Sequence, residues 1–252
     1  MTTLTQVEQF CNTPTSINIR QTLDICWRLR RIAVVSGPSG IGKTTALRRY
    51  AEEHEDAKLI VMSQASGESL NAALSHVAGV LGVESRGRPK ELREQIGVAV
   101  SHLYRDIILV VDEAQYLCVP MLNEFRSISE IYDLPILLCG DQRFTKLLDG
   151  ARKKGLQHFL SFCRPRLRLN GPDRGDVPAL CEHHRITGDR TVNFVIQIAD
   201  NNDGLRSAGD LLLFAQAFAA ADDASVRLKD LQEAAEYIGL STGAGGAAHA
   251  TQ

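Results

Sequence analysis

Short apolar runs alternate with amphipathic segments along the chain as far as residue 169. Nearly continuous runs of β-branched and other apolar residues are typical of strands that are buried on both faces of a parallel sheet. Such runs predict strands at residues 32–36, 58–63, 107–111, 136–139 and 167–169. The segments between them have helical spacing and predict helices at residues 44–54, 70–81, 90–103, 120–131 and 155–162. This alternation indicates an α/β fold.

The pattern changes in the C-terminal part of the chain. From residue 176 to about residue 237 the strand pattern stops and helical spacing continues, which predicts a smaller all-helical part. The last residues are small and polar, a composition that favours disorder. We therefore expect an N-terminal segment, an α/β core, a helical part and a disordered tail, at residues 1–30, 31–172, 173–240 and 241–252.

A glycine-rich loop joins the first predicted strand to the first predicted helix. Residues 37–44, GPSGIGKT, match the pattern G-x-x-x-x-G-K-[ST] in the strand–loop–helix context that this pattern requires. The glycines let successive N–H groups point at phosphate oxygens, and the helix N-terminus adds further donors. Lys43 is expected to reach the β- and γ-phosphates of ATP, and the Thr44 hydroxyl to bind Mg²⁺. The expected nucleotide-binding residues are Gly37, Pro38, Ser39, Gly40, Ile41, Gly42, Lys43, Thr44 and Thr45.

Two acidic residues follow the third predicted strand, in the sequence IILVVDEAQ at residues 107–115. Strands of open α/β sheets end at the edge where ligands bind. Asp112 is expected to hold Mg²⁺, usually through water, and Glu113 to polarise the attacking water as a general base. An Asp-Glu pair after a strand can also be a simple helix cap, but the phosphate loop upstream favours the metal and base roles. The glutamate indicates hydrolysis.

Four more charged residues are candidates for contacts with the nucleotide. Asp141 follows the fourth predicted strand, where its carboxylate can contact the γ-phosphate or the water; a Gly-Asp turn is the alternative. Arg206 lies at a helix start, from which it can fold back onto the nucleotide or face solvent. Arg164 and Arg166 precede the last predicted strand, where an arginine can reach the γ-phosphate of a neighbouring subunit. Because Arg168 lies beside them, a basic face is the alternative.

Composition excludes several other classes of protein. With 252 residues the chain can hold one substantial core and a small appended domain, and its net charge of −2 indicates no particular partner. Its six cysteines are scattered without a C-x-x-C pair, which argues against a zinc ribbon or a disulfide framework. The N-terminus lacks the features of a signal peptide, and no apolar run is long enough to span a bilayer. We therefore expect a reduced, cytoplasmic protein without a membrane partner.

The phosphate loop, the Asp-Glu strand end, the polar residue after the fourth strand and the helical part with Arg206 together resemble an AAA+ ATPase. More narrowly, the chain is similar to the ATP-dependent target-selection proteins of DNA transposition, the family of the phage Mu transposition protein B. The resemblance extends from about residue 10 to residue 240. It rests on the segments FCNTPT, IAVVSGPSGIGKT, VVDEAQYL, LLCGDQRF, GDV and GLRSAGDLL.

This resemblance implies an AAA+ fold, with a central five-stranded parallel sheet flanked by helices and a small C-terminal helical lid. It also implies Mg²⁺-dependent hydrolysis of ATP, with the segment from Phe10 to Thr13 contacting the adenine. Proteins of this family form homo-oligomers or helical filaments on DNA when ATP is bound. They mark that DNA as a transposition target, and they recruit and stimulate the transposase. The implied setting is the cytoplasm of a bacterium or of a phage-infected host.

Three features depart from the family pattern. The Mu protein carries a DNA-binding helical domain before its ATPase, and we expect none in this chain because nothing precedes residue 10 to house it. The family arginine before the last strand falls near Phe162, which leaves Arg164 or Arg166 as substitutes. Where the Mu protein has asparagine after the fourth strand, this chain has Asp141.

Two basic clusters are candidates for sequence-nonspecific binding of duplex DNA. The first, SRGRPKELR at residues 85–93, contains Arg86, Arg88 and Lys90; the second, GARKKG at residues 150–155, contains Arg152, Lys153 and Lys154. Such clusters neutralise backbone phosphates without reading bases, which suits a protein that accepts many target sequences. Neither cluster contains an aromatic residue for base stacking, so duplex is favoured over single-stranded DNA. Ordinary solvated loops are the alternative.

Two other functions compete with that of a transposition regulator. One is an AAA+ ATPase that senses or remodels protein partners, as in secretion; only the basic clusters distinguish it from a DNA-binding protein. The other is a P-loop kinase or metabolic NTPase that works as a monomer. Arg206 and the candidate trans arginines argue against the monomeric enzyme.

Overall fold

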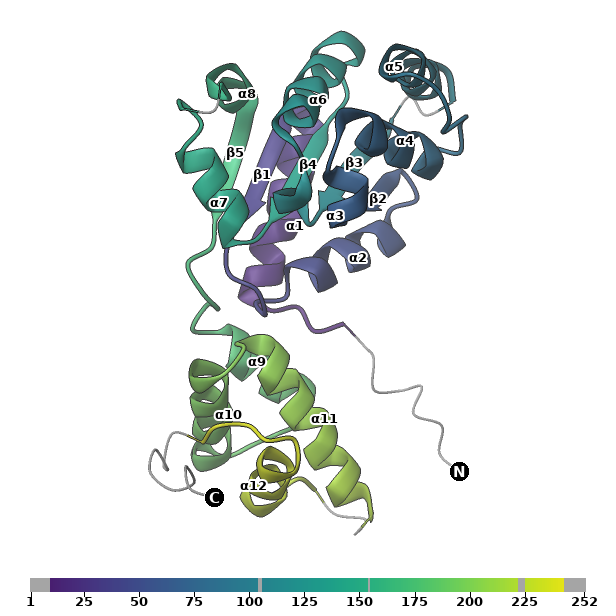
Figure 1. The fold of residues 1–252 in the computed structure, drawn as a ribbon. Coiled ribbons are helices and arrows are strands. Elements are labelled where there is room, and N and C mark those ends of the chain that lie inside the picture. Colours follow the sequence, from purple (N-terminus) through teal and green to yellow (C-terminus); the bar gives the residue numbers. More distant parts are fainter. Residues whose placement is uncertain (1–9, 104–105, 154, 222–224, 243–252) are drawn as a thin grey trace, which may run out of the picture. The chain divides into compact units, whose positions relative to one another are not determined.

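The computed structural model describes residues 10–103, 106–153, 155–221 and 225–242, which form two compact units (Figure 1). The sheet unit contains Asn18–Pro38 and Lys43–Asn170. The helical unit contains Met1–Ile17, Ser39–Gly42 and Gly171–Gln252. The phosphate loop therefore contributes residues to both units.

Five parallel strands form the sheet, as the sequence predicts. Their order is β2-β3-β4-β1-β5, so β2 and β5 are the edge strands. The chain leaves β1 toward one side of the sheet for β2 and β3 and later reaches β5 on the other side. Ligands of open α/β sheets bind at the carboxyl ends of the strands at such a switch point. The strands are β1 (Ile32–Ser36), β2 (Ala57–Val61), β3 (Ile108–Asp112), β4 (Ile136–Gly140) and β5 (Cys163–Arg168).

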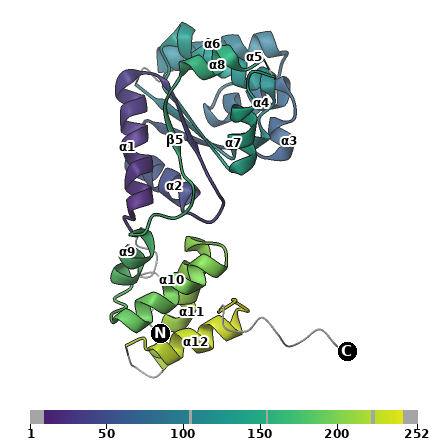
Figure 2. The same cartoon turned by 90° about the vertical axis from the view of Figure 1, so that its left-hand side faces the viewer.

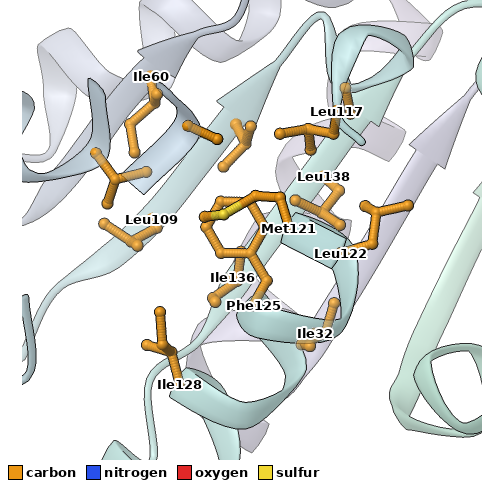
Figure 3. Packing of buried hydrophobic residues seen from close by; sticks show 14 of the residues in the cluster. Ile32, Ile60, Leu109, Leu117, Met121, Leu122, Phe125, Ile128, Ile136 and Leu138 are labelled. Atoms are coloured by element: carbon orange, nitrogen blue, oxygen red, sulfur yellow. The ribbon is translucent and has the colours of Figure 1, made fainter. Parts of the chain in front are cut away.

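Apolar side chains fill the space between the sheet and the helices that cover it. Every residue of β1, β3 and β4 is buried. Figure 3 shows side chains of α6 (Val119–Tyr132), among them Met121 and Phe125, packed against Leu109, Ile136 and Leu138 of the sheet. Figure 2 shows α1 (Pro14–Leu29) on one side of the sheet and, on the other, α3 (Gln64–Gly67), α4 (Leu70–Val80) and α7 (Gln142–Asp149). Burial of these side chains is the main favourable contribution to folding.

The helices of the sheet unit lie close to the predicted positions, with three additions, α1, α3 and α7. Two short segments, the π-helix η2 (Ala99–Leu103) and the 3₁₀-helix η3 (Ala114–Tyr116), complete the unit. The predicted helix at residues 90–103 is thus an α-helix followed by a π-helical turn. The remaining helices are α2 (Lys43–Glu53), α3 (Gln64–Gly67), α4 (Leu70–Val80), α5 (Pro89–Val98), α7 (Gln142–Asp149) and α8 (Gln157–Phe162).

The C-terminal helices confirm the predicted all-helical part. They are α9 (Asp176–His183), α10 (Asp189–Asn201), α11 (Leu205–Ala221) and α12 (Leu228–Tyr237). Val195, Leu211 and Leu231 lie in their shared core. The fully buried Asp176 contacts the first turn of α1, because its carboxylate accepts both the N–H and the hydroxyl of Thr15, at 2.8 and 2.6 Å. Within the described part of the chain, no helix is long and apolar enough to cross a membrane.

Candidate nucleotide-binding and catalytic site

The phosphate loop leaves β1 at Ser36 and enters α2 at Lys43. Two of its glycines have backbone angles in the left-handed region, with φ of +77° at Gly40 and +85° at Gly42. A Cβ on Gly40 would lie 2.1 Å from the carbonyl oxygen of Asp203 in the same helical unit. Position 40 therefore requires glycine for both its conformation and its surroundings.

Lys43 is buried and its ammonium group is held by the loop itself. Nζ donates to the carbonyl oxygens of Gly37 at 3.0 Å and of Pro38 at 2.5 Å. Both acceptors are uncharged, so they fix the position of the ammonium without neutralising its charge. A buried cation at the end of a strand, beside a helix N-terminus, is suited to bind phosphate.

Thr44 and Asp112 bring a hydroxyl and a carboxylate together from the start of α2 and the end of β3. The Thr44 hydroxyl donates to Asp112 Oδ2 at 2.7 Å, and Asp112 Oδ1 accepts the N–H of Glu113 at 2.9 Å. Asp112 is only 2% exposed. These oxygen donors are of the kind that Mg²⁺ prefers, so the two side chains fit a Mg²⁺ ion held with the help of water and phosphate oxygens.

Cys139 of β4 lies close to Asp112 and is fully buried. Burial raises the pKa of its thiol well above the ordinary value, and the neighbouring Asp112 raises it further against the opposing effect of Lys43. The thiol is therefore neutral and adds no negative charge to the site.

Glu113 lies directly after β3 with a left-handed backbone, at φ +57° and ψ +36°. It occupies the position before η3 but makes no side-chain capping bond, so the simple helix-cap alternative does not describe it. Its half-buried carboxylate instead accepts a hydrogen bond from Gln115 Nε2. Gln115 Oε1 in turn accepts the N–H of Asp141, at 3.1 Å. Gln115 is a site residue that the sequence analysis did not single out; its only sequence signal is its place two residues after Glu113.

Asp141 caps α7. Its Oδ1 accepts the N–H groups of Arg143 at 2.7 Å and of Phe144 at 3.3 Å, and its Oδ2 accepts Arg143 Nε at 2.7 Å. These contacts match the turn-forming alternative for this residue. A contact with the γ-phosphate or the attacking water would have to compete with them.

Three predicted nucleotide contacts belong to the helical unit. The N–H of Arg206 donates to the carbonyl oxygen of Gly40 at 3.1 Å, while its side chain pairs with Asp203 at 2.9 Å. Thr13 is buried, and its hydroxyl oxygen accepts the N–H of Ser16 at 3.2 Å in the first turn of α1. Phe10 is half-buried in the segment before that helix.

The prediction that Arg164 and Arg166 precede the last strand is wrong, because both lie within β5. In this edge strand exposed arginines alternate with less exposed residues, a pattern without the apolar run expected of a buried strand. Neither arginine makes an ion pair with any described residue. Arg168, by contrast, pairs with Asp149 at 3.3 Å. Arg166 and Arg168 line a cavity of about 230 Å³ between β5 and α7.

The two basic clusters are separated on the sheet unit. Arg86, Arg88 and Lys90 are exposed at and before the start of α5, which follows β2 in the chain. Arg152 and Lys153 are exposed between α7 and α8, ahead of β5, and Lys154 lies outside the described residues. Figure 1 shows α5 and α8 near opposite edges of the sheet. One subunit therefore presents two separate basic surfaces.

Comparison with known proteins identifies two matching family models. An AAA domain model matches residues 28–148, and a model for the C-terminal part of the Mu B transposition protein matches residues 164–237. Among solved structures, Cdc6p of Pyrobaculum aerophilum is similar, with a TM-score of 0.65 at 16% identity over 92% of this chain and 70% of that one. The RuvB branch migration motor of Thermotoga maritima has a TM-score of 0.53 at 14% identity over 92% of this chain and 72% of that one. At these identities the structures show the fold alone.

Two curated relatives come from a phage and a prophage. The chain is 26% identical to the ATP-dependent target DNA activator B of Escherichia phage Mu over 209 residues, which are 81% of this chain and 65% of that protein. It thus spans less than two thirds of the phage protein's length. It is 32% identical to the DNA transposition protein B of the Mu-like prophage FluMu of Haemophilus influenzae over 200 residues, which are 78% of this chain and 69% of that protein. The chain therefore belongs to the family of Mu B transposition proteins and carries an AAA domain.

Proposed function

We propose that this protein is a Mg²⁺-dependent ATPase that assembles on duplex DNA in its ATP-bound state, selects the DNA as a transposition target and recruits a transposase. The observation that carries the proposal is a group of four residues at the carboxyl ends of β1 and β3: Lys43, Thr44, Asp112 and Glu113. Membership in the Mu B family, with relatives named as an ATP-dependent target DNA activator, supports the DNA-directed part.

The phosphate loop would bind the β- and γ-phosphates through its N–H groups and the ammonium of Lys43. The Thr44 hydroxyl and the Asp112 carboxylate would hold Mg²⁺, which supplies positive charge that stabilises the phosphates during transfer to water. Glu113 would accept a proton from the attacking water, because its carboxylate is half-buried and supported on one side by Gln115.

Further charged residues would complete the site in an assembly. Arg164 and Arg166 lie on an edge strand and make no ion pair with described residues, which leaves them available to the γ-phosphate of a neighbouring subunit. Arg206 and Asp141 already have ion-pair partners, Asp203 and Arg143, both at exposed or half-exposed positions. Exposed pairs of this kind cost little to break, so both residues remain proposed nucleotide contacts. Phe10 and Thr13 would contact the adenine.

The exposed basic residues would bind phosphates of the duplex without reading its sequence. Arg86, Arg88 and Lys90 form one such surface, and Arg152 and Lys153 form the other. Lys154 follows them in the sequence and would take the same role. Because they lie near opposite edges of the sheet, successive subunits of an oligomer would add their contacts along the DNA.

A gel-shift titration with duplex DNA tests this function directly. We expect binding in the presence of a slowly hydrolysed ATP analogue, weak dependence on sequence, and regular oligomers on the DNA in negative-stain images. Binding without nucleotide should be much weaker. A protein that hydrolyses ATP but binds no duplex under either condition would instead act on protein partners. Hydrolysis by a strict monomer with no DNA response would indicate a metabolic NTPase.

A further inference from the structure

Gln115 connects the end of β3 to the end of β4. Its Nε2 donates to Glu113 Oε2, and its Oε1 accepts the N–H of Asp141 at 3.1 Å. β3 and β4 are neighbours in the sheet, and Gln115 lies in the single turn of η3 that follows β3. One side chain therefore contacts the proposed base and the backbone at the end of the adjacent strand.

The same peptide group of β4 also contacts the phosphate loop. The carbonyl oxygen of Gly140 accepts the N–H of Gly37, the first loop residue, at 3.3 Å. The N–H of the next residue, Asp141, donates to Gln115. A continuous chain of hydrogen bonds thus runs from Gly37 through the 140–141 peptide and Gln115 to Glu113.

The surroundings fix how the Gln115 amide is oriented. The N–H of Asp141 can only donate, so the amide oxygen must face it and the NH₂ group must face Glu113. The 140–141 peptide is itself held in place: β4 is buried throughout, and a Cβ on Gly140 would lie 2.6 Å from Cβ of Phe144. The amide therefore presents a donor to the Glu113 carboxylate from a defined direction.

We propose that Gln115 is a positioning residue for ATP hydrolysis. It holds Oε2 of Glu113 in place and leaves Oε1 to accept a hydrogen bond from the attacking water. This support matters because the left-handed backbone of Glu113 is a conformation that non-glycine residues hold only when their surroundings impose it. The inference rests on the proposed function, since it takes Glu113 as the base.

Gln115→Met tests the inference because it removes both hydrogen bonds and keeps the length of the side chain. We expect kcat to fall about ten- to a hundredfold, the size of effect that a misplaced catalytic group produces, while KM and nucleotide affinity change less than about twofold. Gln142→Met is the matched control, since Gln142 is exposed at the start of α7 and should leave all three quantities unchanged. A merely structural role would lower nucleotide affinity and the melting temperature together with kcat.

A further measurement separates positioning from structure. In single turnovers, Gln115→Met should add no loss to that of Glu113→Gln, because residues that act as a unit are not additive.

Wild-type kcat in Gln115→Met, or a loss that adds fully to that of Glu113→Gln, would overturn the inference. The proposed function fails separately: wild-type hydrolysis by Glu113→Gln would show that Glu113 is not the base, and the role of Gln115 would fall with it. If Glu113→Gln loses hydrolysis and Gln115→Met keeps the wild-type rate, only the inference about Gln115 is overturned.

Discussion

At the scale of single residues, the side chain of Lys43 is buried, and both acceptors of its ammonium group are uncharged. Its ammonium is held by the carbonyls of Gly37 and Pro38, and exchange of these two contacts for phosphate oxygens would replace neutral acceptors with charged ones. Binding of ATP therefore depends on this one cation more than on any single loop N–H.

Lys43→Ala should weaken ATP binding about ten- to a hundredfold, because one charge-assisted hydrogen bond contributes about 1.5–3 kcal/mol. A nucleotide titration measures this loss. Lys146→Ala removes the same charge from an exposed position on α7 and should leave affinity unchanged. Equal affinity in the two variants would mean that the loop does not bind phosphate.

At the scale of helices and strands, one ion pair joins α5 to α6. Arg93 donates from Nε and Nη2 to both carboxylate oxygens of Glu124, whose side chain is 7% exposed. Arg93 belongs to the first basic cluster, but this contact commits it to the fold. The exposed residues Arg86, Arg88 and Lys90 are the members that can face a ligand.

Glu124→Gln should lower the free energy of unfolding by about 1–2 kcal/mol, since it leaves a charged arginine opposite a neutral amide. The loss stays below that of a fully buried pair because the Arg93 side chain is 42% exposed and can turn to water. Glu94→Gln is the control: its pair with Lys90 spans 4.0 Å between exposed groups and contributes less than about 0.5 kcal/mol. Chemical denaturation measures the free energy of unfolding of both variants. Equal losses in Glu124→Gln and Glu94→Gln would show that burial of Glu124 does not strengthen its ion pair.

The elements that the sequence predicts well are those whose pattern is local. The strand at residues 32–36 matches β1 because all five of its residues are buried between two layers. By contrast, α1 was not predicted, because its buried face includes Thr15, Ser16 and Thr22 beside apolar residues. The partner that makes Thr15 acceptable there, Asp176, is 161 residues away in the chain.

In the candidate site, too, the sequence predicts only the features that have a local pattern. The phosphate loop and the Asp112–Glu113 pair follow from local motifs, since each motif is a strand end and the turn after it. The hydrogen bond that the Asp141 N–H donates to Gln115 depends on β3 and β4 being neighbours, which no local pattern specifies. The extent of β5 was missed for a related reason: an edge strand with one open face needs no continuous apolar run.

At the scale of the whole molecule, shared sites between subunits would make turnover depend on assembly. Specific ATPase activity should rise with protein concentration and with added duplex DNA. Mixing Arg166→Ala subunits with Glu113→Gln subunits should restore part of the activity, since some interfaces then pair an intact Glu113 with an intact Arg166. The same mixture with Arg164→Ala decides between the two arginines. If the mixtures with Arg164→Ala and with Arg166→Ala both stay inactive at every ratio, neither arginine of β5 acts on the site of a neighbouring subunit.

DNA binding belongs to this largest scale, because individual phosphate contacts are weak and an oligomer sums them. Each backbone phosphate that a basic residue neutralises releases condensed counterions, so affinity falls steeply with salt. Arg86→Ala/Arg88→Ala/Lys90→Ala and Arg152→Ala/Lys153→Ala should each weaken binding about equally on unrelated duplexes. Each should also lower the log–log salt slope by about one for every phosphate that the variant no longer neutralises.

ATP hydrolysis without DNA should survive in both variants, since neither cluster lies at the carboxyl ends of β1 and β3, where Lys43 and Asp112 are found. Lys229→Ala removes an exposed charge that is already paired with Glu233 at 3.2 Å, and it should change neither affinity nor slope. Weaker binding by only one of the two cluster variants would assign the duplex to that edge of the sheet. Unchanged affinity and salt slope in both, with ATP present, would make the clusters ordinary solvated surface and favour an ATPase that acts on protein partners.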